Sequence, residues 1–317
     1  MRLLITGGAG TLGAAIVDRM LEKGGVEILA LDNFATGARG NLPDAAPHFE
    51  FREGSVEDKA FVDKVFADFK PTHVIHSAAA YKDPDDWASD ARTNVEGSIN
   101  VAKAALAAGV RRLVNFQTAL CYGRPDQVPI PSDAPTRPFT SYGVSKTAGE
   151  QILLMSGLNV VSLRLSNITG PRLAIGPIPT FYQRIKAGKG CFCSDTVRDF
   201  MDQDDFLDFL ELALDENAPR GVFNVSTGEG RTIKDIFDVV ADHLGVTVDP
   251  PPPITPPGED DVQAVVLDPT ETEKAFGWKA RRGFDETMRR MLAWYDEHGV
   301  QAVFAHLKAP PQAQESK

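Results

Sequence analysis

Short apolar runs alternate with longer amphipathic stretches along the first half of the chain. Runs rich in Leu, Ile and Val predict buried strands, whereas apolar positions that recur every three or four residues predict helices. We expect strands over residues 2–6, 26–31, 49–52, 73–76, 112–116 and 160–165. We expect helices over residues 11–23, 58–69, 87–108 and 143–155. This alternation predicts an α/β fold with a doubly wound parallel sheet, the Rossmann type, and right-handed crossovers.

The regular alternation ends near Gly170, where glycine, proline and short mixed segments become frequent. We therefore expect a Rossmann domain over residues 1–170 and a smaller mixed α/β C-terminal substrate lobe over residues 171–308. Some chain of this lobe is expected to return to the Rossmann domain. Residues 309–317 offer little to pack and predict a disordered tail.

Composition narrows the class of protein. The 317 residues are 43% hydrophobic, and the formal net charge is −11. An acidic surface of this kind disfavours nucleic acid and anionic membranes as partners. The sequence has no apolar run near the ~18 residues of a membrane span and no signal peptide, so we expect a cytoplasmic protein. Three cysteines cannot form a disulfide framework, and Cys191 and Cys193, without a nearby histidine, make a poor metal site, so we expect no metal.

A glycine-rich segment, TGGAGTLG, follows the first expected strand and begins the first helix. Gly7, Gly10 and Gly13 in this position are typical of a loop that binds the pyrophosphate of a dinucleotide. Asp32 ends the next strand, where it can accept hydrogen bonds from ribose hydroxyls and would repel a 2′-phosphate. We therefore expect NAD rather than NADP, although Arg39 lies a few residues further on. The alternative is a tight turn without a ligand.

Tyr142 and Lys146 lie four residues apart at the start of an expected helix, so both side chains face the same side. Thr118 ends the fifth expected strand and could hydrogen-bond the same substrate oxygen as the tyrosine. A nearby ammonium and the positive nicotinamide ring would favour the phenolate of Tyr142. A tyrosine and lysine at this spacing are common by chance, but a hydroxyl, a tyrosine and a lysine downstream of a nucleotide loop together indicate a catalytic set.

The sequence resembles the extended branch of the short-chain dehydrogenase/reductase superfamily, which contains NAD-dependent nucleotide-sugar epimerases and dehydratases of the UDP-galactose 4-epimerase type. The resemblance covers roughly residues 1–296. It rests on TGGAGTLG, LDN, HSAAA, TNVEGSINV, TALCYG, SYGVSK, LRLSNITGPR, VRDFMDQDD, FGWKA and MLAWYDEHG, in this order along the chain.

The resemblance implies a role for each matching residue. Tyr142 corresponds to the general base, Lys146 orients the nicotinamide ribose and lowers the pKa of the tyrosine, and Thr118 holds the substrate hydroxyl. The implied cofactor-binding residues are Gly7, Gly10, Thr11, Leu12, Gly13, Asp32, Asn33, Ser55, Val56, Ala78, Asn94, Tyr142 and Lys146. The implied substrate-binding residues are Thr118, Tyr142, Asn167, Phe192, Arg198, Tyr81 and Lys82.

The acidic residues that this chain lacks indicate which of the family's reactions to expect. The 4,6-dehydratases carry an acid pair directly after the catalytic hydroxyl residue, and this chain has Ala119 and Leu120 there. The remaining set favours 4-epimerisation of a nucleotide-diphospho-sugar, most simply a UDP-hexose, through a 4-keto intermediate with NAD retained. A reductase or dehydratase that uses dissociable NAD(P)H and an NAD-sensing binding protein are the alternatives. The resemblance also implies a homodimer formed through the helices that begin near Trp87 and Tyr142.

The sequence departs from the family in two places. Ser55 stands where an acid usually binds the adenine, and Asp58 is expected only to cap a helix. The segment Pro256–Asp260 lacks the arginine of the family's R-x-G-D motif, which contacts the nucleotide. These departures leave the base of the nucleotide open. Asn167, where uronate-acting members often have threonine, favours a neutral sugar.

Overall fold

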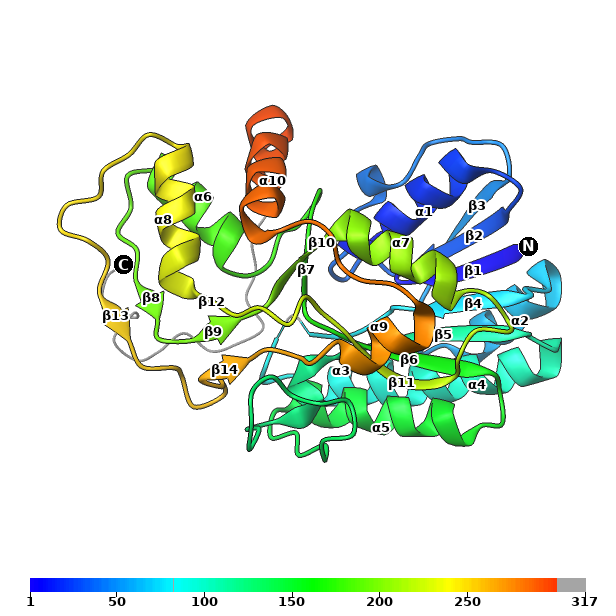
Figure 1. Ribbon diagram of the computed structural model, residues 1–317. Coiled ribbons are helices and arrows are strands. Elements are labelled where there is room, and N and C mark those ends of the chain that lie inside the picture. The colour runs from blue at the N-terminus through cyan, green and yellow to red at the C-terminus, as the bar shows by residue number, and fades with distance from the viewer. Residues whose placement is uncertain (82, 301–317) are drawn as a thin grey trace.

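Seven parallel strands form the central sheet in the computed structural model, which describes residues 1–81 and 83–300 (Figure 1). Their spatial order is β11-β6-β5-β4-β1-β2-β3, and every neighbouring pair is parallel. The strands are β1 (Arg2–Thr6), β2 (Glu27–Asp32), β3 (Phe49–Glu53), β4 (His73–His76), β5 (Arg112–Thr118), β6 (Val160–Leu165) and β11 (Gly221–Val225). The predicted doubly wound Rossmann sheet is confirmed.

The direction of winding reverses between β1 and β4, because β2 and β3 lie on one side of β1 and the later strands on the other. Ligands of such sheets bind at the carboxyl ends of the strands next to this switch point. The glycine-rich loop after β1 and the segments after β4 and β5 meet there.

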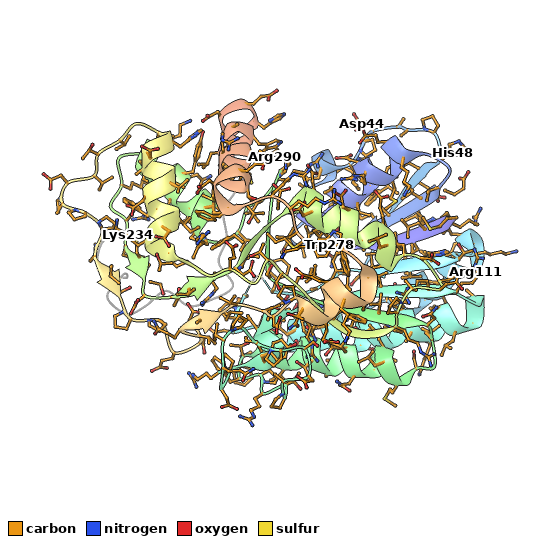
Figure 2. The ribbon with its side chains drawn as sticks, in the orientation of Figure 1. Asp44, His48, Arg111, Lys234, Trp278 and Arg290 are labelled. Atoms are coloured by element: carbon orange, nitrogen blue, oxygen red, sulfur yellow. The ribbon has the colours of Figure 1, made fainter. Side chains whose placement is uncertain are left out.

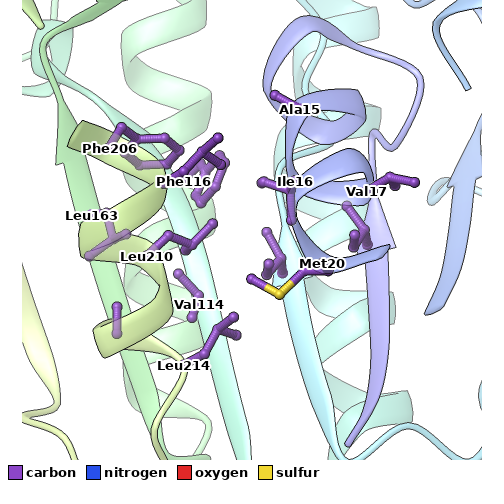
Figure 3. Packing of buried hydrophobic residues seen from close by; sticks show 14 of the residues in the cluster. Ala15, Ile16, Val17, Met20, Val114, Phe116, Leu163, Phe206, Leu210 and Leu214 are labelled. Atoms are coloured by element: carbon purple, nitrogen blue, oxygen red, sulfur yellow. The ribbon is translucent and has the colours of Figure 1, made fainter. Parts of the chain in front are cut away.

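Helices cover both faces of the sheet. One face carries α1 (Thr11–Lys23) and α7 (Gln203–Ala213), and the other carries α2 (Lys59–Phe69), α4 (Gly97–Ala108) and α5 (Ser141–Met155). Figure 3 shows Ile16 of α1 and Phe206 of α7 over the first face. The ring of Phe206 packs edge-on against the ring of Phe116, with 5.3 Å between the two ring centroids. Each such buried side chain stabilises the fold by roughly 1.5–3 kcal/mol.

The expected helix over residues 87–108 is one continuous run with a local change of winding. It consists of α3 (Trp87–Asp90), a π-helical segment η2 (Ala91–Glu96) and α4. π-helical turns of this kind are rare in proteins, and those that occur often lie at functional sites. Here the turn surrounds Asn94, whose side chain bonds outside the helix. The amphipathic pattern predicted the helix but not this turn.

The smaller lobe gathers short elements at the carboxyl edge of the sheet (Figure 1). They are α6 (Pro177–Lys186), β8 (Cys193–Ser194), β9 (Val197–Arg198), β12 (Arg231–Thr232), α8 (Ile233–His243), β13 (Ile254–Thr255), β14 (Ala264–Val265) and α10 (Phe284–His298). The chain returns to the Rossmann unit as α7, β11 and α9 (Thr270–Phe276). β7 (Asn167–Thr169) and β10 (Phe200–Asp202) pair between the two parts, and η1 (Arg39–Asn41) and η3 (Ala119–Tyr122) are single 3₁₀ turns.

Ion pairs join the two parts of the chain. Arg290, labelled on α10 in Figure 2, donates from Nη1 to both carboxylate oxygens of Asp202 at 2.9 Å. Arg282 donates to Asp205, the buried acid in the first turn of α7, at 2.6 Å. The predicted tail, residues 309–317, lies outside the described residues.

Close contact between α5 and η2 requires a glycine. A Cβ on Gly149 would meet the backbone oxygen of Asn94 at 2.4 Å and Oγ of Ser98 at 2.7 Å. We expect Gly149→Ala to lower the free energy of unfolding by about 1–3 kcal/mol, because overpacking outweighs the gain in helix propensity. Urea unfolding measures this loss.

Gly40→Ala is the matched control, because a Cβ there would meet nothing within 4 Å. We expect the control to keep the parent stability. An unchanged or raised stability of Gly149→Ala would show that the two helices can separate at little cost.

Candidate active site

The loop after β1 packs so closely that side chains would not fit. Gly7 has φ 70°, and a Cβ on Gly13 would meet the oxygen of Gly7 at 2.2 Å. The following helix α1 begins at Thr11, and its N-cap, Gly10, makes no side-chain capping bond. Helix N–H groups in this position bind phosphate oxygens. The loop therefore fits the pyrophosphate of a dinucleotide.

Asp32 is held at the end of β2 beside this loop. Its Oδ2 accepts the Ala9 N–H at 2.9 Å, and its Oδ1 accepts the Phe34 N–H at 2.7 Å. Burial raises the pKa of Asp32, and the backbone hydrogen bonds oppose this shift. Each carboxylate oxygen has further lone pairs for a ribose hydroxyl. Arg39 donates instead to the carbonyls of Leu42 and Pro43.

The remaining residues predicted to bind cofactor follow the carboxyl ends of neighbouring strands. Thr11 Oγ1 donates to the Arg172 carbonyl at 3.1 Å, and Ser55 Oγ accepts the Glu57 N–H at 3.2 Å. The Ala78 N–H donates to Thr6 Oγ1 at 3.2 Å. The others are Leu12, partly buried against the core, Asn33, which accepts the N–H of Ala35, and the buried Val56.

Tyr142 lies in the first turn of α5, which Thr140 caps by accepting the Gly143 N–H at 3.1 Å. The Thr118 hydroxyl, at the end of β5, is hydrogen-bonded to the phenol. Burial raises the pKa of Tyr142 above its ordinary value, the charges of Tyr81 and Asp90 add to the rise, and the Thr118 hydrogen bond opposes it. The site thus brings the tyrosine and the threonine together but disfavours the phenolate unless a cation is close.

Lys146 lies one turn after Tyr142 and is buried. Its Nζ donates to the Phe116 carbonyl at 2.6 Å. Burial lowers the pKa of Lys146 to about 8, and the charge of Glu150 opposes the shift. Glu150 itself pairs with Arg164 at 2.8 Å in the interior. The ammonium is therefore fixed on the same helical face as the phenol.

Asn94 connects the segment after β4 to α5. Its Oδ1 accepts the Ala80 N–H at 2.9 Å, and its Nδ2 donates to the Ala80 carbonyl at 3.1 Å and to Ser145 Oγ at 3.0 Å. The neighbouring His76 is buried and bonds Thr6 and Ser98, as expected for a structural histidine.

Tyr81 lies between the tyrosine of α5 and the loop after β2. Its ring centroid is 6.0 Å from that of Tyr142, and its hydroxyl is hydrogen-bonded to Thr36. Tyr81 therefore lies close to Tyr142, and its predicted contact with the substrate stays a prediction. Lys82 lies outside the described residues.

Two of the predicted substrate residues, Asn167 and Arg198, lie close together. Asn167 donates from its backbone N–H and from Nδ2 to the Asp199 carbonyl at 3.0 and 2.9 Å. The preceding Arg198 pairs with Asp261, and burial lowers the pKa of Arg198 while Asp261 opposes the shift. Phe192 is partly buried between α6 and β8.

Two acidic residues of the site were missed in the sequence. Asp90 is 2% exposed and hydrogen-bonded to Ser141, next to Tyr142. Its position four residues before Asn94 places both on one helical face, which was a usable signal. Asp261 follows the segment that lacks the family arginine, and no local pattern indicated its pairing with Arg198.

The described residues contain no group of three or more His, Cys, Asp or Glu side chains placed to hold a metal ion. None of the helices in the part of the chain that the structure describes is long and apolar enough to cross a membrane.

Comparison with known proteins identifies the class. The model of the NAD dependent epimerase/dehydratase family matches residues 3–226. The UDP-glucose 4-epimerase of Mycolicibacterium smegmatis is 30% identical over 93% of this chain and 98% of its own length. The chain therefore belongs to the NAD dependent epimerase/dehydratase family, and NAD is its cofactor.

Solved structures resemble this chain over nearly its whole length. The Bordetella bronchiseptica enzyme WbmG, crystallised with NAD and UDP, is 64% identical with a TM-score of 0.92, covering 98% of this chain and 99% of that chain. The UDP-glucose 4-epimerase of Thermotoga maritima, crystallised with UDP-glucose, is 28% identical with a TM-score of 0.85, covering 94% of this chain and 99% of that chain.

The charge of Asp90 gives a pH-dependent prediction. Asp90→Asn keeps an oxygen for Ser141 and removes a negative charge that disfavours the phenolate of Tyr142. We expect the pKa of Tyr142 to fall by roughly half a unit to one unit, because a like charge is lost. The phenolate absorbance, titrated with Tyr142→Phe as the blank, measures this pKa.

Asp83→Asn, an exposed change in the same segment, is the control and should leave the titration unchanged. A pKa of Tyr142 that rises or stays constant in Asp90→Asn would mean that Asp90 acts only by holding Ser141.

Proposed function

We propose that the protein is an NAD-dependent 4-epimerase of a nucleotide-diphospho-sugar, most simply a UDP-hexose. One observation carries this proposal: Thr118 is hydrogen-bonded to Tyr142, and buried Lys146 follows Tyr142 by one turn on the same face of α5. Ala119 and Leu120, the two residues after Thr118, have side chains that cannot transfer protons. The names of the relatives described above support the same activity.

The chain's own residues would move one proton. Tyr142 would take the proton of the C4 hydroxyl while Thr118 holds that oxygen. Lowering the pKa of an ordinary phenol from about 10 to neutrality requires roughly 4 kcal/mol, and the burial that raises the pKa of Tyr142 adds to this cost. The Lys146 ammonium and a bound nicotinamide cation would together supply it, because nearby cations favour the phenolate. NAD, when bound, supplies reversible acceptance of hydride. Return of that hydride to the opposite face of a 4-keto sugar, with the proton given back by Tyr142, completes the inversion.

The experiment for this proposal follows the anomeric proton NMR signals of UDP- and dTDP-hexoses with purified protein and no added cofactor. We expect a second anomeric signal that grows to a constant ratio. If turnover occurs only with added NAD(P)H and gives a deoxygenated or reduced sugar, the reductase or dehydratase alternative replaces this proposal. Tight NAD binding without turnover of any sugar would support a sensing protein.

Tyr142→Phe tests the assigned base within this assay. We expect turnover to fall by about 10²–10⁴-fold, the usual contribution of a general base, with NAD binding retained. Tyr182→Phe, in the smaller lobe and bonded to Asp296, is the control and should leave turnover unchanged. Turnover of Tyr142→Phe near the parent rate would exclude the base assignment.

We further propose a homodimer through α4 and α5, which lie side by side (Figure 1). Val144 and Met155 of α5 are 50% and 81% exposed, and Leu106 of α4 is 49% exposed. Val144 and Met155 are about three helical turns apart and so share one face. An apolar face on adjacent helices supports association with a second copy.

Val144→Glu tests this dimer, because it would bury a charge in the interface. We expect sedimentation to give the mass of a monomer for this variant and of a dimer for the parent. Leu212→Glu, on α7 at the opposite face of the sheet and 43% exposed in the parent, should remain a dimer. A monomeric parent would contradict the proposal.

We also propose that residues 1–170 and 171–308 act as the cofactor unit and the substrate unit. The ion pairs of Asp18 with Arg172 at 2.7 Å and of Arg19 with Asp208 at 2.9 Å join the two ranges and support a fixed relation between them.

A further inference from the structure

Two arginines lie directly opposite each other on adjacent strands of the smaller lobe. β12 pairs antiparallel with β9, and the register places Arg231 opposite Arg198. Side chains directly opposite in a sheet project from the same face. A Cβ on Gly230 would meet Val197 at 2.5 Å, so the residues next to the two arginines occupy the other face.

The face that carries the arginines is turned toward the end of β5. Arg198 is also in register with Val265 of β14. Val265 packs in one apolar cluster with Ala119, Cys121 and Tyr122, which follow Thr118 directly. This face is therefore continuous with the turn that carries the proposed catalytic hydroxyl.

The guanidinium of Arg231 reaches toward the strand pair of Asn167. It lies 5.2 Å from the ring centroid of Phe284, and that ring is 6.3 Å from the ring of Phe200. Phe200 is the register partner of Asn167 in the β7–β10 pair. Asn167, Arg198 and Arg231 thus come from three strands that meet in one region.

Two cations directly opposite each other disfavour the pairing of their strands unless anions lie between or beside them. Arg198 has Asp261 as its carboxylate partner, and Arg231 has Glu229 at 3.0 Å. A guanidinium has five N–H donors. Among the described residues, Arg198 further donates only to the Val197 carbonyl, so both groups keep donors for another anion.

We propose that Arg231 is a second diphosphate-binding residue that works beside Arg198. The inference rests on the proposed nucleotide-diphospho-sugar substrate, because it assigns a ligand to the two negatively charged phosphates. The segment Pro256–Asp260 contains no arginine that could bind phosphate. The next residue, Asp261, is an acid that pairs with Arg198. Arg231 therefore supplies the charge that this segment lacks.

Calorimetric titration of the NAD-loaded protein with UDP tests the proposal. We expect Arg231→Ala to weaken UDP binding by about tenfold to a hundredfold, the usual loss for a charge-assisted hydrogen bond. Arg231→Lys should give an intermediate affinity, because it keeps the charge but not the planar fork. Arg289→Ala, an exposed change on α10, should bind UDP like the parent.

Glu229→Gln separates this role from a structural one. If Arg231 serves only its ion pair with Glu229, then Glu229→Gln and Arg231→Ala should weaken UDP binding alike, and the proposal is overturned. If Arg231 binds diphosphate, Glu229→Gln frees the guanidinium, and the affinity for UDP should stay unchanged or rise. Thermal unfolding of each variant shows that the compared proteins are folded, and Arg231→Lys provides the test should Arg231→Ala not fold.

The controls also separate this inference from the proposed function. A parent protein that binds none of UDP, dTDP and GDP contradicts the nucleotide-sugar substrate itself. A parent and an Arg289→Ala variant that bind UDP, together with an Arg231→Ala variant of parental affinity, contradict the role of Arg231 alone.

Discussion

The placing of partly buried Tyr142 and buried Lys146 one turn apart on the same face of α5 is the constraint on which the rest of the site depends. Burial raises the pKa of the phenol and lowers that of the amine to about 8, so desolvation disfavours the charge on each group. A phenolate and an ammonium side by side stabilise each other, and this mutual attraction is strongest where water is excluded. The same burial that makes isolated charges costly therefore makes their pair effective, provided that the geometry is fixed.

The fold fixes that geometry by close backbone contacts. Gly149 lets α5 approach the π-helical turn, and Asn94 in that turn bonds both Ala80 and Ser145. The Phe116 carbonyl at the sheet receives the Lys146 ammonium. Sheet, turn and helix are thus joined around α5, and this rigidity would preorganise Tyr142 and Lys146 for the proposed acid–base role.

The sequence predicted the parts of this protein that local patterns determine. Buried parallel strands read as apolar runs, and the glycine loop is recognisable because its glycines follow one strand and begin one helix. Helix bounds near Tyr142 differ by two residues, because the cap at Thr140 extends α5 to Ser141. The capping role expected of Asp58 is confirmed by its bond to the Phe61 N–H.

Contacts between distant segments could not be predicted in the same way. The π-helical turn at Asn94 spans only 6 residues, which is too short for the apolar pattern to reveal a change of winding. The register that places Arg231 opposite Arg198 joins β12 to β9, and β10, α7 and β11 lie between these two strands in the sequence. The ion pair of Arg198 with Asp261 likewise joins residues that are far apart in the sequence. The position of Tyr81 depends on Thr36 in another loop.

In the proposed reaction, the hydrogen at C4 leaves the sugar and returns to the same carbon on the opposite face. A UDP-hexose that carries deuterium at C4, incubated with the protein in ordinary water, tests this claim directly by NMR or mass spectrometry of the epimer. We expect the product to keep its deuterium at C4. An epimer with protium at C4 would exclude this mechanism, because the hydrogen would then have exchanged with solvent.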